Sequence, residues 1–305
     1  MARHFLSLFD LTKEEIDQLL DRGIWFKKEK QSGRTPKVLE NKSLAMVFEK
    51  SSTRTRVSFE IAMFELGGHA LNLAASGSQL GRGETYEDTA RVLSRYVDGI
   101  MVRTFEQTKL ESMAEVASVP IINGLTDLYH PCQVLADLMT VKENKGSLKP
   151  LHITYVGDGN NLANTWITAA IILGFKLSIA TPKGYEPAAA ILNQVKQGGY
   201  DQISIGNDPV AAVKDADVIN TDTWVSMGQE GSGEAEKKKM FQPFQVNAAL
   251  LAKAKSEAIV LHCLPAHRGE EITDEVMDGP QSRIFDEAEN RLHIQKAILE
   301  KFMGA

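Results

Sequence analysis

The stretch Ser51–Glu60 reads SSTRTRVSFE and stands between two segments of different pattern. Before it, Leu44–Phe48 is an apolar run of the length typical of a buried strand. After the arginines, Val57–Leu66 has the composition of a helix, and Gly67 and Gly68 follow as residues that end helices. The stretch therefore predicts a strand, a short connection and a helix, with hydroxyl and guanidinium groups gathered where the helix begins.

The start of that helix has the chemistry of an anion site. The first backbone N–H groups of a helix have no partner within the helix, and this end of the helix dipole is positive. Serine and threonine hydroxyls add donors, while Arg54 and Arg56 add planar groups that fit oxyanions. Because cations are disfavoured at this end, two arginines in the first turn favour a bound anion such as phosphate. The alternative is an ordinary Ser/Thr cap followed by two solvated arginines.

Beyond this stretch, short apolar runs alternate with helical patterns along the whole chain. A helix with Thr12 and Glu15 as a capping box opens the sequence. Further helices are expected at residues 86–97, 131–144, 162–173 and 287–302. Strands are expected at residues 44–48, 69–74, 99–102, 119–123, 151–156, 177–180, 202–205, 218–220 and 258–262. This alternation predicts an α/β fold with parallel sheets.

The segment Lys145–Pro150 is the best candidate for a domain boundary, because the alternation restarts after it. The chain of 305 residues is long enough for two hydrophobic cores. We expect one domain at residues 1–146, a second at residues 147–286, and a terminal helix at residues 287–305 that packs back on the first domain. The stretch Thr223–Lys239 is too polar and too rich in glycine for a core element, and we expect it to be mobile.

Composition excludes several classes of protein. The net charge is −6 and no basic block occurs, which argues against a nucleic-acid partner. No apolar run approaches the roughly 20 residues of a membrane helix. Only two cysteines occur, which fits a reducing compartment, and the acidic start of the chain is unlike a targeting peptide. We therefore expect a cytoplasmic globular protein.

Three further groups of residues stand at the ends of predicted strands or the start of a helix. His130 begins the run HPCQ, which offers either an ordinary turn or a histidine donor for a carbonyl oxygen, with Gln133 beside it. Arg103 ends a strand, which is where ligands gather in open α/β sheets, although an edge arginine in a salt bridge also fits. Cys263 lies in the run HCLP after another strand, where a lone buried cysteine is usually only a small apolar residue.

Three patterns are weaker when taken alone. The run GDGNNL at Gly157–Leu162 resembles a dinucleotide fingerprint, but Leu162 stands where the third glycine belongs. No P-loop motif is present either. Asp222 begins the run DTWVSMG, in which a loop carboxylate is usually just solvated. Arg291 stands four residues after Glu287 and can form a simple ion pair along the terminal helix.

Four motifs in order span both halves of the chain. They are S-T-R-T-R at residues 52–56, H-P-C-Q at 130–133, D-x-W-x-S-M-G at 222–228 and H-C-L-P at 262–265. Together they resemble the signature motifs of the aspartate/ornithine carbamoyltransferase family. The resemblance implies transfer of the carbamoyl group of carbamoyl phosphate to the δ-amine of L-ornithine, giving L-citrulline and phosphate in arginine biosynthesis or breakdown. It also implies a cleft between the two domains as the active site, a homotrimer with shared sites, and no metal or organic cofactor.

The resemblance assigns a role to each matching residue. The implied carbamoyl-phosphate contacts are Ser52, Thr53, Arg54, Thr55, Gln79, Arg103, His130, Gln133, Cys263, Leu264 and Arg291. Arg103, His130 and Cys263 are the implied catalytic residues among them. The implied ornithine contacts are Asn161, Asp222, Ser226 and Met227. Gln79 would reach the site of a neighbouring subunit, and the Leu264–Pro265 bond is a candidate cis peptide. Arg82 stands where the aspartate enzymes have a lysine, so its role stays open.

Alternatives remain at this stage. A related carbamoyltransferase would use N-acetylornithine, putrescine or aspartate, but an acceptor with two carboxylates calls for cations near Asp222–Gly228, and none is there. A blocked or absent α-amine would leave Asp222 without its charge partner. A Rossmann dehydrogenase conflicts with the glycine pattern. A non-catalytic binding protein for anions or amino acids would not need His130, Gln133 and Cys263 together.

Overall fold

The computed structural model describes residues 2–74, 77, 79–225, 231 and 233–304, which form two compact units. Unit 1 comprises Met1–Met139 and Glu289–Ala305, and unit 2 comprises Thr140–Ala288. The sequence boundaries after residues 146 and 286 differ from these, because both divisions fall inside helices. Helices α5, Pro131–Lys145, and α12, Ile284–Met303, each begin in one unit and end in the other. A sequence marks where a helix ends, whereas packing determines which unit each turn joins.

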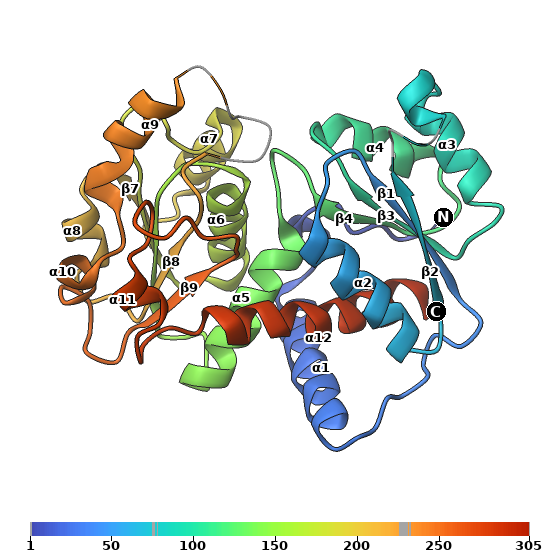
Figure 1. Ribbon diagram of the computed structural model, residues 1–305, viewed down its shortest axis with the longest axis horizontal. Coiled ribbons are helices and arrows are strands. Elements are labelled where there is room, and N and C mark those ends of the chain that lie inside the picture. Colours follow the sequence, from blue (N-terminus) through green and yellow to red (C-terminus); the bar gives the residue numbers. More distant parts are fainter. Residues whose placement is uncertain (1, 75–76, 78, 226–230, 232, 305) are drawn as a thin grey trace. The chain divides into compact units, whose positions relative to one another are not determined.

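Unit 1 is built on a parallel sheet, as predicted (Figure 1). Within its described residues the strand order is β2-β1-β3-β4. The strands are β1 Ser43–Phe48, β2 His69–Ala74, β3 Gly99–Arg103 and β4 Ile121–Leu125. The helical elements are η1 Leu8–Asp10, α1 Lys13–Gln31, α2 Thr53–Glu65, η3 Leu80–Arg82, α3 Tyr86–Leu93, α4 Gln107–Val116, the first turns of α5 and most of α12. The predicted capping box is confirmed, since Thr12 and Glu15 cap each other's backbone N–H at the start of α1.

Helix α2 begins at Thr53, so the hydroxyl- and arginine-rich run lies in its first turn. The Ser52 hydroxyl caps the helix by accepting a hydrogen bond from the backbone N–H of Thr55 at 3.3 Å. Thr55, Phe59 and Met63 are buried at a spacing of four residues, which fixes the rotation of the helix against the sheet. This packing turns the Thr55 side chain inward while Arg54 stays exposed.

Two helices of unit 1 differ from expectation. The helix predicted at residues 86–97 ends as α3 at Leu93, because the chain turns there. Val97 is nevertheless buried beside Ile100, which explains its apolar pattern. Helix α4 was not predicted, since only Leu110 and Met113 of its ten residues are buried and its apolar face is weak. It forms the crossover that two adjacent parallel strands require.

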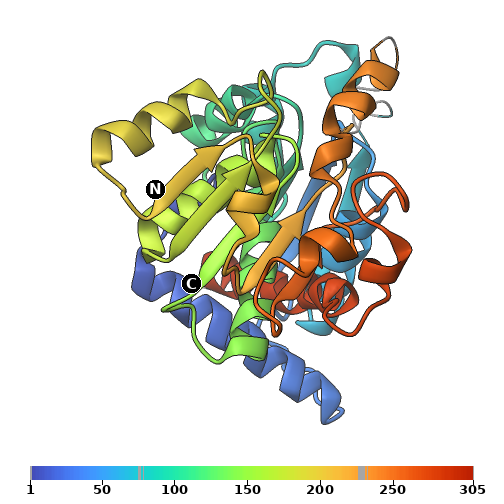
Figure 2. The same cartoon turned by 90° about the vertical axis from the view of Figure 1, so that its left-hand side faces the viewer.

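Unit 2 repeats the architecture with a larger parallel sheet, seen with its strands side by side in Figure 2. Within its described residues the order is β7-β6-β5-β8-β9. The strands are β5 His152–Val156, β6 Lys176–Ala180, β7 Ile203–Gly206, β8 Val218–Thr221 and β9 Ile259–His262. The helical elements are α6 Asn161–Leu173, α7 Ala189–Gly198, α8 Pro209–Val213, α9 Glu234–Phe241, η4 Gln242–Phe244, α10 Ala248–Leu251 and α11 Asp274–Met277. Val156, Ala180, Ile219 and Val260 lie together in one apolar core of this unit.

In each sheet the chain adds strands first on one side of its first strand and then on the other, so the strand order reverses once. In unit 1 the chain passes from β1 outward to β2, and then resumes on the other side of β1 at β3. In unit 2 it passes from β5 to β6 and β7, and then resumes on the other side of β5 at β8. Ligands bind at the carboxyl ends of strands at such reversals, because the adjoining loops diverge there and leave a crevice. The loops after β1 and β3, and those after β5 and β8, are therefore the places to look for a site.

The stretch Thr223–Lys239 differs from expectation at both ends. Trp224 is 3% exposed, and its ring centroid lies 5.9 Å from that of Phe241. Helix α9 begins at Glu234 and includes the last residues of the stretch. The expectation that no core element lies here is therefore wrong at Thr223 and Trp224, whereas none of residues 234–239 is buried. Residues 226–230 and 232 lie outside the described residues.

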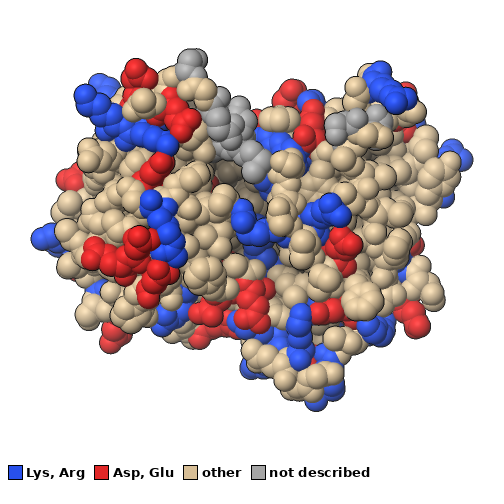
Figure 3. All heavy atoms as spheres, in the orientation of Figure 1, with Lys and Arg blue, Asp and Glu red and all other residues tan. Residues whose placement is uncertain are grey.

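The distribution of surface charge and the hydropathy of the helices agree with the expectations from composition. On the face drawn in Figure 3, the Lys and Arg side chains are interspersed with Asp and Glu side chains. Among the described residues, no helix combines the length and the hydropathy that crossing a membrane requires.

Candidate active site

The Thr55 hydroxyl is the meeting point of two buried arginines in unit 1. Its Oγ1 accepts a hydrogen bond from Arg103 Nη1 at 3.1 Å and another from Arg291 Nη2 at 2.9 Å. Thr55 is 1% exposed, Arg103 8% and Arg291 4%. Two guanidinium groups in so little solvent repel each other strongly, so this arrangement is suited to an anion that lies between them.

His130 and Gln133 complete this group, which we call the Thr55 cluster: Thr55, Arg103, His130, Gln133 and Arg291. Arg291 Nη1 donates a hydrogen bond to Gln133 Oε1 and lies 3.4 Å from His130 Nε2. Gln133 Nε2 in turn donates to the buried Asp137 carboxylate at 2.7 Å. The first turn of α2, the end of β3, the start of α5 and the middle of α12 thus each contribute one residue or more to this cluster.

The environment of His130 sets its protonation state. Burial lowers the pKa of His130 well below its usual value, and the positive charges of Arg291 and Arg103 lower it further. The imidazole is therefore neutral at physiological pH. A neutral ring donates one hydrogen bond without adding a third positive charge, which suits it to polarise a carbonyl oxygen.

Cys132, inside the same HPCQ run, has a structural role. Its thiol is buried, and Sγ donates to the backbone carbonyl of Asn123 on β4 at 3.3 Å. Burial raises the pKa of Cys132 to about 12, so it stays a thiol. The reading of a lone cysteine as a small apolar residue fits Cys132, whereas Cys263 is only partly buried.

The remaining predicted residues of the first motif line the open end of α2. Thr53 and Arg54 are exposed and Ser52 is partly so. Arg56 points away from this group, and its Nε lies 3.7 Å from the carboxylate of Glu60, one turn later. Of the two arginines that suggested an anion, Arg54 therefore remains available for one, while Arg56 has a carboxylate neighbour of its own.

Gln79 and Arg82 lie at a different place in unit 1. Gln79 is exposed, immediately before the short helix η3 that contains Arg82. It borders a cavity of about 280 Å³, whose other lining residues are Val47, Leu73, Leu80, Glu84, Thr89, Val92 and Leu93. Gln79 is not a partner in the hydrogen bonds given above for Thr55, Gln133 and Arg291.

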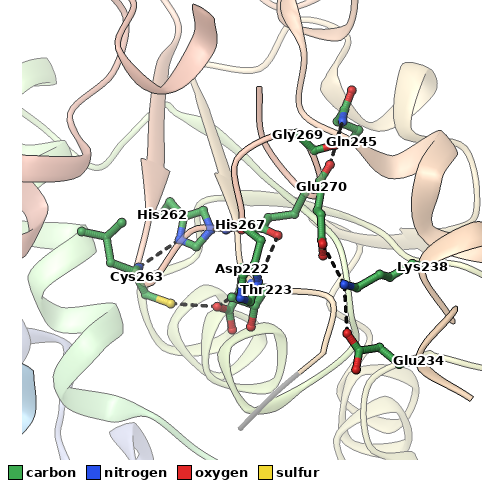
Figure 4. A network of polar contacts seen from close by, with 12 residues as sticks. Asp222, Thr223, Glu234, Lys238, Gln245, His262, Cys263, His267, Gly269 and Glu270 are labelled. Atoms are coloured by element: carbon green, nitrogen blue, oxygen red, sulfur yellow. Dashed lines mark hydrogen bonds and ion pairs between the residues drawn. The ribbon is translucent and has the colours of Figure 1, made fainter. Parts of the chain in front are cut away.

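A second group of polar side chains lies in unit 2, at the ends of β5, β8 and β9 (Figure 4). Asp222 Oδ1 accepts from Cys263 Sγ at 2.9 Å and from the backbone N–H of Thr223 at 2.7 Å. Asp222 Oδ2 accepts from Asn160 Nδ2 at 2.8 Å. We call Asn160, Asp222 and Cys263 the Asp222 cluster. It presents a carboxylate and a thiol, both partly exposed, and so is suited to bind a cation or an amine.

His262 holds the loop after β9 in place through contacts of both its ring nitrogens. His262 Nδ1 accepts from the backbone N–H of Leu264 at 2.9 Å, and His262 Nε2 lies 2.9 Å from the buried Glu271 carboxylate (Figure 4). Leu264 has φ +58°, a left-handed conformation that is uncommon for a leucine, and its bond to Pro265 is cis as predicted. Strained backbone of this kind is typical of functional sites, where surrounding contacts hold it in place.

The remaining predicted ornithine contacts have different outcomes. Asn161 is the first residue of α6, next to Asn160, and is partly buried. Ser226 and Met227 lie outside the described residues. Asn160 was not predicted, although an asparagine before a helix is a common cap and its side chain accepts from Leu162 N–H at 2.9 Å. That capping signal was the one by which the sequence pointed to it.

The partial glycine fingerprint has a packing explanation. A side chain at Gly159 would place its Cβ within 2.3–2.4 Å of backbone atoms of Tyr185, Glu186 and Pro187. Glycine is therefore required here by close contact between two loops of unit 2. This removes the remaining signal for a dinucleotide.

Two groups of side chains bring metal-ligand atoms within 4.8 Å of one another among the described residues: Asp222, His262 and Cys263, and His267, Glu270 and Glu271. In the first group both nitrogens of His262 already make hydrogen bonds, so neither offers a lone pair. In the second, Glu270 is paired with Lys238 Nζ at 2.7 Å. Both groups are explained by polar contacts within the protein.

The fold and the two clusters define a class of protein: a two-unit α/β protein with a buried pair of arginines suited to an anion in one unit and a carboxylate suited to an amine in the other. Comparison with known sequences gives the family. The profile described as the carbamoyl-P binding domain of aspartate/ornithine carbamoyltransferase matches residues 3–143, and the Asp/Orn binding domain matches residues 149–302. The chain belongs to the aspartate/ornithine carbamoyltransferase family, which is a family of transferases.

Relatives match the chain over its whole length. It is 54% identical to an ornithine carbamoyltransferase of Pelobacter propionicus, with 100% of this chain and 99% of the relative covered. It is 53% identical to that of Pyrococcus horikoshii, over 99% of this chain and 96% of the relative. The solved ornithine carbamoyltransferase of Pyrococcus furiosus superposes with a TM-score of 0.95 at 52% identity, covering 100% of this chain and 98% of that one.

Proposed function

We propose that this protein transfers the carbamoyl group of carbamoyl phosphate to the δ-amine of L-ornithine, forming L-citrulline and phosphate. The observation that carries the proposal is the convergence of Arg103 and Arg291 on Thr55, at the start of α2 and beside a neutral His130. The relatives that match the full chain are named for the same acceptor, ornithine.

Carbamoyl phosphate fits the chemistry of unit 1. In this proposal its phosphate binds Ser52, Thr53 and Arg54 at the start of α2, where backbone N–H groups and the helix dipole favour an anion. The carbonyl oxygen faces the Thr55 cluster. Negative charge develops on this oxygen as the amine attacks, and donors held in a dry site stabilise it without rearranging. The backbone carbonyl of Leu264 accepts a hydrogen bond from the carbamoyl nitrogen, and Gln133 and Cys263 are further contacts of this substrate.

Ornithine fits the chemistry of unit 2. Asp222 pairs with the α-ammonium, together with Ser226 and Met227, and Asn161 binds the α-carboxylate. The δ-amine must lose a proton before it attacks, since a free alkylammonium titrates near about 10.4. A bond then forms between the δ-nitrogen and the carbonyl carbon, and the bond from that carbon to the phosphate oxygen breaks. Phosphate leaves with the bonding electron pair and takes up the proton that the attacking nitrogen loses.

The test is an assay of phosphate release and citrulline formation across a panel of amines. The panel contains ornithine, N-acetylornithine, putrescine and aspartate. We expect ornithine to be carbamoylated with the highest kcat/KM. A higher value for any other amine in the panel would replace the acceptor in this proposal, and no transfer to any amine would reject a carbamoyltransferase.

We further propose a homotrimer whose active sites are shared, in the cytoplasm, where both free thiols, Cys132 and Cys263, would stay reduced. The edge strand β2 supports a neighbouring subunit. Its residues are mostly exposed, whereas parallel sheets are normally covered on both faces. Large apolar side chains of unit 1 are also exposed, including Phe64 at 70% and Tyr96 at 75%.

In a shared site, Gln79 would bind the carbamoyl phosphate of the adjacent subunit. A head-to-tail ring of three copies closes and gives each site residues from two chains. The test mixes Gln79→Ala chains with Arg54→Ala chains, denatures them and refolds them together. We expect activity above that of either parent, because some hybrid trimers regain one intact site. Activity equal to the average of the two parents would mean that each chain completes its own site.

A further inference from the structure

Helix α9 of unit 2 carries three consecutive lysines, Lys237, Lys238 and Lys239, in different surroundings. The Lys237 side chain is 14% exposed, and its Nζ lies 2.7 Å from Asp158 Oδ2. Lys239 is exposed. A lysine ammonium is rarely buried unless it is paired, so the inward position of Lys237 needs its carboxylate partner.

Aromatic rings enclose the Lys237–Asp158 pair. The Lys237 ammonium lies 5.2 Å from the ring centroid of Tyr185 and 5.4 Å from that of Phe241, within the range of cation–π attraction. The two rings meet edge to face at 4.9 Å, and Trp224 lies against Phe241. This enclosure reduces screening by solvent, so replacing Lys237 leaves the buried Asp158 carboxylate without this ion-pair partner.

Asp158 belongs to the loop between β5 and α6, and that loop has little freedom to relax. The Asp158 side chain is 11% exposed. Burial raises the pKa of this carboxyl group, and the hydrogen bond from Lys237 opposes the rise. The next residue, Gly159, donates its backbone N–H to the Tyr185 carbonyl at 2.9 Å. Because Gly159 has no Cβ, the two loops can approach this closely, and the hydrogen bond holds them together.

Two residues after Asp158, the same loop reaches the Asp222 cluster. Asn160 donates to Asp222 Oδ2 at 2.8 Å and caps α6 with its side-chain oxygen. A shift of the loop would therefore move the group that orients one of the two oxygens of Asp222. The backbone from Asp158 to Asn160 therefore connects the Lys237–Asp158 ion pair to the side chain that orients Asp222.

We infer that Lys237 is a positioning residue for the acceptor amino acid: its ion pair with Asp158 holds the 157–161 loop so that Asn160 orients Asp222. Lys237 acts through this loop and not by contact with the reacting atoms. This inference rests on the proposed function, because it takes Asp222 as the group that pairs with the α-ammonium of ornithine.

The test compares Lys237→Met with the matched control Lys239→Met, which removes the same charge from an exposed position on the same helix. We expect Lys237→Met to raise the KM for ornithine about tenfold, since coupling between neighbouring groups is commonly of this size. The KM for carbamoyl phosphate should stay within about twofold, because its predicted phosphate contacts, Ser52, Thr53 and Arg54, lie in unit 1. Lys239→Met should match the wild type in both constants, and Lys237→Arg should restore most of the ornithine KM.

Further variants separate positioning from general stability. Asp158→Asn should raise the ornithine KM similarly, and adding it to Lys237→Met should cause less than the sum of the two effects, because both break one pair. These variants also serve if Lys237→Met does not fold. Equal rises in both KM values, or a lower Tm with an unchanged ornithine KM, would overturn the inference. A wild type that does not carbamoylate ornithine would instead overturn the proposed function, and the two failures are thereby distinguished.

Discussion

The Thr55 cluster and the Asp222 cluster occupy equivalent places in two similar sheets, yet their chemistry is opposite. Each lies where the strand order reverses, at the carboxyl ends of parallel strands. The Thr55 cluster is buried and contains two arginines beside a neutral histidine, whereas the Asp222 cluster is partly exposed and presents a carboxylate and a thiol. The topology therefore determines where a ligand binds, and the side chains after each strand determine which ligand it is.

The two clusters also differ in how their charges are held. In unit 1, Arg103 of β3 and Arg291 of α12 both donate to the Thr55 hydroxyl of α2, so the folded chain holds two guanidinium groups that repel each other. In unit 2 the Asp222 carboxylate already accepts hydrogen bonds from Asn160, Thr223 and Cys263. We expect changes in the first cluster to affect mainly turnover, and changes in the second to affect mainly binding of the acceptor. Three predictions test this contrast, in order of decreasing effect.

The largest effect is expected for Arg54→Ala, which removes an exposed guanidinium from the first turn of α2. We expect kcat/KM for carbamoyl phosphate to fall by about 10²–10³-fold, as it does when one charge-stabilising donor is removed from an active site. Arg56→Ala is the matched control, because Arg56 lies near Glu60 and makes only a surface pair. It should stay within about threefold of the wild type. Equal losses in the two variants would reject Arg54 as a specific phosphate ligand.

A smaller and more selective effect is expected for Asp222→Asn. The amide keeps the shape of the side chain but loses the negative charge that pairs with an ammonium, so the KM for ornithine should rise by about a hundredfold. The KM for carbamoyl phosphate in the same variant is the internal control and should change by no more than about threefold. If both constants rise together, Asp222 maintains the structure of its loop and does not select the acceptor.

The smallest effect is a pH dependence caused by His130. Its pKa is lowered in the folded state by burial and by Arg291 and Arg103, so below about pH 6.5 the unfolded chain binds a proton that the folded chain does not. Stability must therefore fall as the pH decreases. Between pH 6.5 and 5.5 we expect the unfolding free energy of the wild type to fall by about 1 kcal/mol more than that of His130→Gln.

Denaturant unfolding of the two proteins at each pH measures this difference, and their comparison at pH 8 corrects for packing changes in the variant. Identical pH dependence would mean that folding leaves the pKa of His130 unchanged, so that the ring is protonated in the folded protein at pH 5.5. The cluster would then carry a third positive charge, and the contrast with unit 2 would be larger than described here.

Much of the local structure could be predicted from the sequence, because it depends on interactions between residues that are close together in the chain. The apolar runs at Leu44–Phe48 and Gly99–Arg103 became buried strands, and Ser52 capped α2. Asp137 lies four residues after Gln133 on α5, a spacing that favours the hydrogen bond between their side chains. Helix α4 was missed because its burial rests on two side chains only.

By itself the sequence determined the two parallel α/β sheets, the helix start rich in donors, and the family motifs, because strand and helix periodicities and caps depend on near neighbours. Only the tertiary structure decided which side chains meet. Arg291 reaches Thr55 across 236 residues of sequence, and His262 lies against Glu271 through a loop whose path no local pattern specifies. It also decided that Arg54 stays available while Arg56 lies near Glu60, since rotation of α2 is set by which of its residues pack on the sheet. Charge, burial and direction at a site arise from packing between distant segments, and local sequence preferences do not contain them.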